Sequence, residues 1–410
     1  MENLPQAGAV TLDAIYAAAA VLVPHIRRTP LLHSEALSDA TGYEVWLKAE
    51  NLQRTGSFKV RGALAKIARL SADERRRGLV AASAGNHAQG VAFAAQQYGV
   101  ACTIVMPETA PLTKITATRR LGAEVLLSGQ TYDEAYTYAV RLAEQRGAVF
   151  VHPFDDPQVI AGQGTLGLEI LEQMPDLEAV LVPVGGGGLI AGIATVLDAL
   201  KPDVRLLGVQ ASGAAAFAPS LAAGRPVELA RATTIADGIR VLRPGDLTVQ
   251  LCRGRVHEVL EVPDEDIADA IVQLLEREKL VVEGAGAVGV AALLSGRVRL
   301  RPGARVVAIL SGGNIDINLV ARIIEHGLTK AGRYLVVRTV VDDRPGQLLR
   351  LLEPLAAMRV NIISIEHHRA GTRVPVDQSL VTLHLETRDP EHCREIIAAL
   401  QARGYDVSVQ

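Results

Sequence analysis

One lysine of this chain lies where its amine can act as a nucleophile. The stretch TGSFKVRGA, residues 55–63, places Lys59 in a small, glycine-flanked turn where an alanine-rich helical pattern begins. The chain has seven lysines against 35 arginines, so arginine is its usual surface cation. An amine can lose its proton and attack a carbonyl, which a guanidinium cannot do. Lys59 is therefore a candidate for covalent chemistry, with a plain surface lysine at a helix start as the alternative.

A run of four glycines, residues 185–188, is the second candidate feature. It follows the apolar run AVLVPV and precedes a helical pattern that begins near Leu189. Glycines let the backbone approach a ligand closely, and consecutive N–H groups at a helix N-terminus attract anions. The pattern predicts a phosphate site, and a merely flexible turn is the alternative. Neither the GxGxxG nor the GxxxxGK spacing occurs here, so a dinucleotide or P-loop site is not indicated.

Two further loops follow apolar runs in the same way. In SAGNHAQG (83–90), Ser83, Gly85 and the amides of Asn86 and His87 form a second predicted anion site, suited to a carboxylate. His87 has no second ligand at metal spacing, and a single histidine at a helix start is more often structural. SGGN (311–314) offers a hydroxyl and two glycines, and carries little weight by itself.

Short runs rich in valine and isoleucine alternate with alanine-rich helical patterns through the first 328 residues. The runs are GLVAAS, ACTIVMP, AEVLLS, AVLVPV and RVVAILS. This alternation predicts an α/β fold whose parallel sheets are covered by helices on both faces. Ligands of such folds bind in the loops at the carboxyl ends of the strands, which is where the candidate loops lie.

The pattern changes after about residue 328. GLTKAGR is typical of a polar linker, and the strands and helices that follow have the order βαββαβ. This order predicts a small ferredoxin-like domain, punctuated by the polar turns DDRPG and RAGTRVPVDQ. We therefore predict a catalytic region over residues 1–328, a linker over 329–333 and a second domain over 334–410.

The composition excludes several classes of protein. The 410 residues are 49% hydrophobic and 3% aromatic, with a net charge of −3. A nucleic-acid binder would need basic stretches with aromatic side chains, and a membrane protein would need a long apolar span. AIYAAAAVLV lacks a basic segment before it and stops at Pro24, so it predicts a packed helix capped by Thr11. We expect a cytoplasmic protein with three free thiols, Cys102, Cys252 and Cys393.

Together the four motifs SFKVRGA, SAGNHAQG, PVGGGGL and SGGN resemble the serine/threonine dehydratases of the pyridoxal-phosphate fold-type II family. The resemblance extends from about residue 12 to residue 326. It implies two α/β subdomains of the tryptophan synthase β-like kind and pyridoxal 5'-phosphate as cofactor. The C-terminal segment, with VVDDRPGQLLRLL and NIISIEHHR, resembles an ACT domain, a regulatory module that binds amino acids.

The resemblance assigns roles at the matching positions. It implies that Lys59 binds the cofactor covalently and is catalytic, that Asn86 hydrogen-bonds the pyridoxal 3-oxygen, and that Ser311 faces the pyridine nitrogen. Phe58 is also expected at the cofactor. The amides expected at the phosphate are those of Gly185, Gly186, Gly187, Gly188 and Leu189. The residues expected at the substrate carboxylate are Ser83, Ala84, Gly85, Asn86 and His87.

Two departures from the related serine racemases narrow the implied reaction. Those enzymes carry a serine directly before the Gly-Asn-His, where it acts as an acid and base, whereas this chain has Ala84. Their metal site has acidic ligands shortly after a Gly-Val pair, and the matching positions here are Gln210, Ala214 and Ala216. We therefore expect no divalent cation at this position.

The implied reaction is the α,β-elimination of L-threonine to 2-oxobutanoate and ammonia, with some activity on L-serine. The alternatives are an L-serine or hydroxyaspartate dehydratase, a serine racemase-like enzyme, and a catalytically idle amino-acid sensor. The intact Lys59 disfavours the idle sensor. An amino acid is the expected effector of the C-terminal domain. A homodimer or homotetramer is expected, without nucleic-acid or membrane partners.

Overall fold

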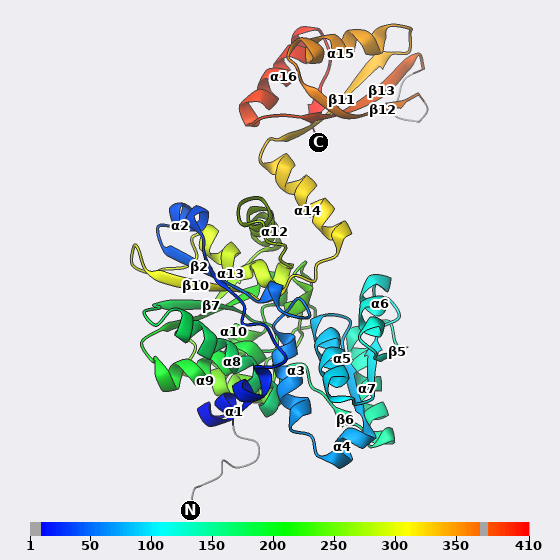
Figure 1. The fold of residues 1–410 in the computed structure, drawn as a ribbon. Helices are drawn as coiled ribbons and strands as arrows, with labels where there is room; N and C mark the ends of the chain where they lie inside the picture. Colours follow the sequence, from blue (N-terminus) through cyan, green and yellow to red (C-terminus); the bar gives the residue numbers. More distant parts are fainter. Residues whose placement is uncertain (1–9, 370–375, 410) are drawn as a thin grey trace, which may run out of the picture. The chain divides into compact units, whose positions relative to one another are not determined.

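The computed structural model describes residues 10–369 and 376–409. The chain divides into two compact units, one ending at Ile315 and the other beginning at Asp316. The first unit contains two sheets and the second contains one (Figure 1). The sequence-predicted sites all lie in the first unit.

The larger sheet of the first unit has six strands and is parallel except at one edge. Its order is β1 (Leu31–His33), β2 (Glu44–Ala49), β10 (Arg305–Leu310), β7 (Ala179–Pro183), β8 (Arg205–Ala211) and β9 (Glu258–Val262). The short edge strand β1 runs antiparallel to β2, which the alternation of strands and helices does not predict. The five other strands run parallel, as predicted.

The smaller sheet has four parallel strands in the order β5 (Glu124–Leu127), β4 (Cys102–Met106), β3 (Leu79–Ala82) and β6 (Val149–Phe150). Alternate residues of β3 enter two different apolar cores. Leu79 and Ala81 pack in the core that contains α3 and α5, and Val80 and Ala82 pack in the core that contains α7. Helices therefore cover both faces, as expected for a parallel sheet.

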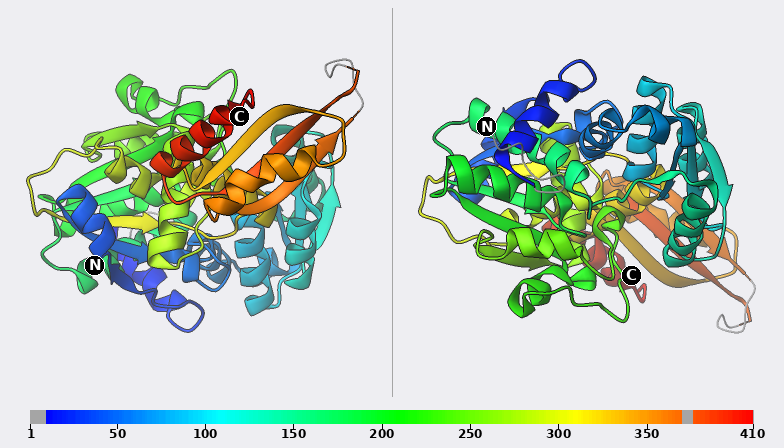
Figure 2. Two further views of the ribbon diagram at one scale, coloured as in Figure 1. Left: turned by 90° about the horizontal axis from the view of Figure 1, so that it is seen from above. Right: turned by 90° about the horizontal axis from the view of Figure 1, so that it is seen from below.

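The helices of the first unit connect the strands, and the two subdomains lie side by side in both figures (Figures 1 and 2). Short 3₁₀ segments are η1 (Glu50–Leu52), η2 (Ser212–Ala214) and η3 (Asp237–Ile239), and η4 (Leu274–Glu278) is a π-helical turn. The α-helices are α1 (Leu12–Leu22), α2 (Glu35–Thr41), α3 (Lys59–Ala68), α4 (Ala72–Arg77), α5 (Asn86–Tyr98), α6 (Leu112–Arg120), α7 (Tyr132–Arg146), α8 (Pro157–Gln173), α9 (Gly188–Leu200), α10 (Phe217–Ala223), α11 (Asp246–Cys252), α12 (Asp264–Gln273) and α13 (Gly284–Leu294).

The N-terminal apolar run forms α1, as predicted. Thr11 Oγ1 accepts a hydrogen bond from Ala14 N at 3.2 Å and caps the helix. Across residues 10–369 and 376–409, no helix combines the length and the apolar character that a bilayer span requires. The three cysteines are free thiols, which confirms that prediction.

The second unit contains the predicted βαββαβ order after a first helix, α14 (Ile317–Lys330). Its antiparallel sheet has the order β12 (Asn361–His368), β13 (Gln378–Glu386), β11 (Tyr334–Asp342) and β14 (Ser408–Val409). The helices α15 (Gln347–Ala357) and α16 (Pro390–Ala402) share one apolar core with β11 and β13. Part of the predicted turn RAGTRVPVDQ lies outside the described residues.

The segment around the predicted linker differs from its expected form. GLTK, predicted as the start of a polar linker, is the last turn of α14. Leu328 continues the apolar positions Ile323 and Ile324 of this helix, and that pattern outweighs the cost of about 1 kcal/mol for Gly327 in a helix. Compactness divides the chain after Ile315, whereas the sequence suggests residue 328. The end of the catalytic region therefore stays a prediction.

Candidate active site

Lys59 is the first residue of α3, and Phe58 occupies the N-cap position. The segment before it is fixed against the SGGN loop. Phe58 N donates to the Ser311 carbonyl at 3.1 Å, and Ser57 forms an isolated β-bridge with Gly312. The structure thus brings together two motifs that lie about 250 residues apart in the sequence.

A buried ionic cluster anchors α3 just behind Lys59. The Arg61 guanidinium contacts Glu50 at 2.8 Å and Glu169 at 2.7 Å, and Lys48 Nζ contacts Glu169 at 2.7 Å. Lys48, Glu50 and Arg61 are fully buried. Burial by itself would lower the pKa of Arg61, but the Glu50 and Glu169 carboxylates raise it. Two cations and two anions therefore compensate one another and fix the helix.

The Lys59 amine points toward the loop after β6. Its Nζ donates to the Pro153 carbonyl at 2.9 Å. Burial lowers the pKa of Lys59 to about 8, and the nearby Glu283 carboxyl acts in the opposite direction. An amine with this pKa is partly unprotonated near neutral pH, as a base or nucleophile requires.

The predicted carboxylate loop ends where α5 begins. Gly85 is the N-cap of α5, and its amide donates to Ser83 Oγ at 3.1 Å, so this amide already has a partner. His87 is buried, and its Nε2 donates to the Val151 carbonyl at 2.9 Å. Burial and, secondarily, Lys59 lower the pKa of His87 to about 3. The His87 side chain is therefore neutral and structural near neutral pH.

Asn86 connects this loop to two other segments. Its Nδ2 donates to Glu283 Oε1 at 2.6 Å, and its Oδ1 accepts from Asn314 Nδ2 at 2.7 Å. Asn314 Nδ2 also donates to the Thr55 carbonyl at 2.8 Å. Because Asn314 holds the oxygen, the amide nitrogen of Asn86 keeps one N–H for a further acceptor.

Glu283 is a site residue that the motifs do not reveal. It is 4% exposed and precedes α13, in GAGAVGV, where no sequence pattern marks it as functional. Burial raises the pKa of Glu283 to about 7, with a second contribution from Asp237. A Cβ on Gly312 would lie 2.5 Å from Glu283 Oε1, so the SGGN loop packs directly on this carboxyl. A perturbed, buried carboxyl beside Lys59 is typical of a functional site.

The four glycines form the loop between β7 and α9, as predicted. Gly187 has φ +92°, a conformation that favours glycine. The protein packs closely on each glycine: an added Cβ would lie 2.8 Å from Ile239 at Gly185, 2.3 Å from Phe154 at Gly186 and 2.5 Å from Phe217 at Gly187. These contacts favour a fixed loop over a flexible turn.

Four helices start at this site without a side-chain cap from the described residues: α3, α5, α9 and α13. Elsewhere in the same unit, α1, α2, α4, α7 and α8 each have one. Ser57 Oγ is fully buried and has no hydrogen-bond partner within residues 10–369 and 376–409. Helix starts with free donors bind phosphate and carboxylate groups. With the Lys59 amine, this donor set fits pyridoxal phosphate.

The position that holds acidic metal ligands in serine racemases is occupied by a hydrogen-bonded amide. Gln210 is fully buried; its Oε1 accepts from Phe217 N at 3.0 Å and its Nε2 donates to Glu261 at 3.4 Å. Ala214 and Ala216 contribute methyl groups there. In the described part of the chain, no group of three His, Cys, Asp or Glu side chains is placed to hold a metal ion. The absence of a divalent cation remains a prediction.

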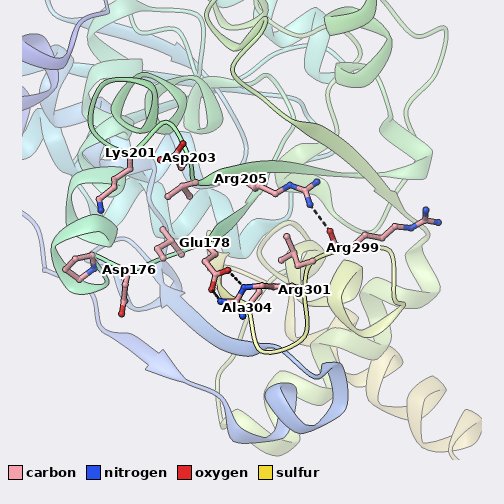
Figure 3. A pocket seen from close by; sticks show the side chains of 12 residues that line it. Asp176, Glu178, Lys201, Asp203, Arg205, Arg299, Arg301 and Ala304 are labelled. Carbon is pink, nitrogen blue, oxygen red and sulfur yellow. Dashed lines mark hydrogen bonds and ion pairs between the residues drawn. The ribbon is translucent and has the colours of Figure 1, made fainter.

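A surface pocket of about 620 Å³ lies at the other end of the larger sheet (Figure 3). Its lining includes Glu178, Arg205 and Arg301, which precede or begin β7, β8 and β10. Arg301 is paired with Glu178 at 2.5 Å. The glycine loop and Ser311 follow the carboxyl ends of β7 and β10, so this pocket is separate from the site.

Comparison with known proteins defines the class. Residues 22–312 match the family described as pyridoxal-phosphate dependent enzyme, and residues 335–402 match the ACT domain. The first match covers most of the chain, which therefore belongs to the pyridoxal-phosphate dependent enzymes and carries a C-terminal ACT domain. The predicted cofactor and fold are confirmed.

Individual relatives are more specific. The chain is 52% identical to L-threonine ammonia-lyase of Thermotoga maritima, an alignment that covers 98% of this chain and 99% of that protein. A solved threonine deaminase, from the source abbreviated T.th., is 46% identical with a TM-score of 0.71, covering 75% of this chain and 99% of its own. Maize serine racemase is 36% identical with a TM-score of 0.74, covering 78% and 99%. The predicted resemblance to serine/threonine dehydratases is thus confirmed.

Proposed function

We propose that this protein eliminates water and ammonia from L-threonine to form 2-oxobutanoate, with L-serine as a lesser substrate. The observation that carries the proposal is the Lys59 amine, of pKa about 8, beside four helix starts with free donors. The near full-length likeness to an L-threonine ammonia-lyase supports threonine as the substrate.

Each predicted site residue has a distinct task in this proposal. Pyridoxal phosphate, when bound, supplies the electron-withdrawing ring that makes the substrate Cα–H acidic. Lys59 would hold the cofactor and then remove the Cα proton with its free amine. Asn86 and Ser311 would bind the ring oxygen and ring nitrogen, and Phe58 would adjoin the ring. The amides of Gly185, Gly186, Gly187, Gly188 and Leu189 would bind the phosphate.

The start of α5 would hold the substrate carboxylate. The amides of Asn86 and His87 are the free candidates, since the Gly85 amide donates to Ser83. Ala84 carries a methyl group and can neither donate nor accept a proton, which favours elimination over racemisation. Ser311, a neutral partner for the ring nitrogen, favours elimination as well, because it does not stabilise a protonated ring.

The regulatory part of the proposal concerns the second unit. ACT domains are regulatory modules that bind amino acids, and we expect isoleucine or valine to act here. The polar turn DDRPG, which joins β11 to α15, offers a place for such a ligand. We also propose a homodimer or homotetramer.

A substrate panel tests the proposal. The purified enzyme with added pyridoxal phosphate should form keto acid fastest from L-threonine, more slowly from L-serine and least from 3-hydroxyaspartate, with EDTA having no effect. A preference for L-serine or hydroxyaspartate would overturn the threonine assignment. D-Serine as the main product would favour a racemase. Failure to show the visible absorbance of bound cofactor would favour the idle sensor.

A further inference from the structure

The loop that follows β6 contacts both halves of the candidate site. Pro153 accepts the hydrogen bond from Lys59 Nζ, and the ring of Phe154 lies directly beneath the glycine loop at Gly186 and Gly188. His152 shapes this turn, because its Nδ1 accepts from Asp155 N at 2.7 Å. Burial lowers the pKa of His152 to about 4, so this nitrogen remains an acceptor near neutral pH.

Asp155 supplies the cap that helix α11 lacks in its own sequence. The N-cap residue of α11 is Gly245, which has no side chain to accept a hydrogen bond. The Asp155 carboxylate accepts instead from Asp246 N at 3.1 Å, Leu247 N at 3.0 Å and Thr248 N at 3.2 Å. A carboxylate that binds three amides at a helix N-terminus is held firmly by charge and hydrogen bonds.

Helix α11 in turn holds the glycine loop. Thr248 is fully buried, and its Oγ1 donates to the Gly186 carbonyl at 2.7 Å. Gly245 N donates to the same carbonyl at 3.2 Å. The Gly186 carbonyl is therefore fixed from the helix that Asp155 caps, which determines the direction of the neighbouring peptide groups.

We propose that Asp155 is a positioning residue for cofactor phosphate, acting through α11 and Thr248 on the Gly186 peptide. This inference rests on the proposed function, since it assigns the phosphate to the glycine loop. Asp155 itself touches neither the cofactor nor the substrate in this scheme. Its removal would let the loop move while Lys59 keeps its amine and its chemistry.

The test compares the affinity for pyridoxal phosphate with that for pyridoxal, which has the same aldehyde but no phosphate. Both are titrated into the cofactor-free, full-length protein and followed by visible absorbance. Asp155→Ala should weaken binding of pyridoxal phosphate by about tenfold and change binding of pyridoxal much less. Asp155→Asn, which keeps one acceptor oxygen, should fall between the two.

Two variants make the result specific. Thr248→Val removes the hydroxyl that bonds Gly186, and should reproduce the selective loss even if Asp155→Ala folds poorly. The double variant should be little weaker than either single variant, because both break one connection. The matched control is Asp156→Ala: Asp156 caps α8 and pairs with Lys66 at 2.6 Å, so its loss should lower stability without selectively weakening phosphate binding.

The outcomes separate this inference from the proposed function. Equal loss of affinity for both compounds in Asp155→Ala and Thr248→Val, or no loss in either, would overturn the positioning role while leaving the function intact. A wild-type protein that binds neither compound would overturn both. A similar selective loss in Asp156→Ala would show that the effect follows any weakening of this loop, and would also overturn the inference.

Discussion

Asn86 and Glu283 form a 2.6 Å hydrogen bond that joins the start of α5 to the residue before α13. The first of these residues belongs to a recognisable motif and the second does not. Because Asn86 donates from Nδ2, the bond is strongest when Glu283 is ionised, yet burial raises the pKa of Glu283 to about 7. The carboxyl therefore titrates within the physiological range.

The first prediction concerns stability against pH. The folded pKa of Glu283, about 7, lies above its ordinary value of 4.5, so the folded protein binds this proton more tightly than the unfolded chain. The resulting stabilisation is complete below about pH 4.5 and is lost as pH rises through 7. Glu283→Gln should remove a loss of ~3 kcal/mol between pH 4 and 8. Urea unfolding of the cofactor-free protein measures it.

The matched control for this experiment is Glu265→Gln, at an exposed position on α12. It should unfold with the same pH dependence as the wild type. Parallel pH profiles for the wild type and Glu283→Gln would contradict the assignment of a raised pKa to Glu283.

The second prediction concerns the covalent anchor. Lys59→Ala should abolish elimination and the visible absorbance of bound cofactor, while circular dichroism shows an intact fold. Lys59→Arg should be equally inactive although it keeps the charge, because the reaction needs an amine that can lose its proton. Near wild-type turnover in either variant would exclude Lys59 as the catalytic base.

The third prediction concerns the missing acid at Ala84. The wild type should form little D-serine from L-serine. Ala84→Ser should raise the ratio of D-serine to keto acid, because it adds a proton donor on the face where this chain has a methyl group. Chiral chromatography measures the ratio, and abundant D-serine from the wild type would show that Ala84 does not limit racemisation.

The fourth prediction concerns the ring nitrogen. Ser311 is 3% exposed, and its hydroxyl is the proposed neutral partner of that nitrogen. Ser311→Ala should weaken cofactor binding or turnover by about 1 kcal/mol, the net worth of one hydrogen bond. Ser311→Asp should favour a protonated ring and increase side products such as those of transamination. An unchanged product spectrum in Ser311→Asp would contradict this role.

The fifth prediction concerns regulation. An effector amino acid should shift the affinity for threonine by about 1–3 kcal/mol, the usual size of allosteric coupling, and threonine should shift the effector's affinity equally. A chain that ends after Ile315 should keep lyase activity and lose the response. If the full-length enzyme binds no amino acid besides its substrate, and the truncation changes only the oligomeric state, the second unit serves assembly.

The sequence predicts those parts of the molecule that have a strong local pattern. Strands such as β7 and β10 are buried apolar runs, and glycine-rich loops follow them directly, so both the sheets and the positions of the loops could be predicted. The order βαββαβ of the second unit also follows from alternating apolar positions, because α15 and α16 share one core with the sheet.

Other parts depend on contacts between distant residues and leave no local pattern. Glu283 is one acidic residue among many until the fold places it beside Asn86 and Lys59. Asp155 follows a strand of two residues, β6, which is too short for periodicity to reveal. The caps show the same limit, since the residue that caps α11 lies 91 positions before Asp246 in the sequence.

Gly85 shows a conflict between durability and usefulness in this fold. An added Cβ there would meet no described atom within 4 Å, and its φ of −136° is open to other residues, so space does not demand a glycine. Serine or aspartate at this N-cap would satisfy the first amides of α5 and commonly strengthens a protein by about 1 kcal/mol. The same side chain would occupy the donors meant for a substrate carboxylate. Selection for a tougher protein would therefore fill this corner and silence it, whereas selection for turnover keeps it bare.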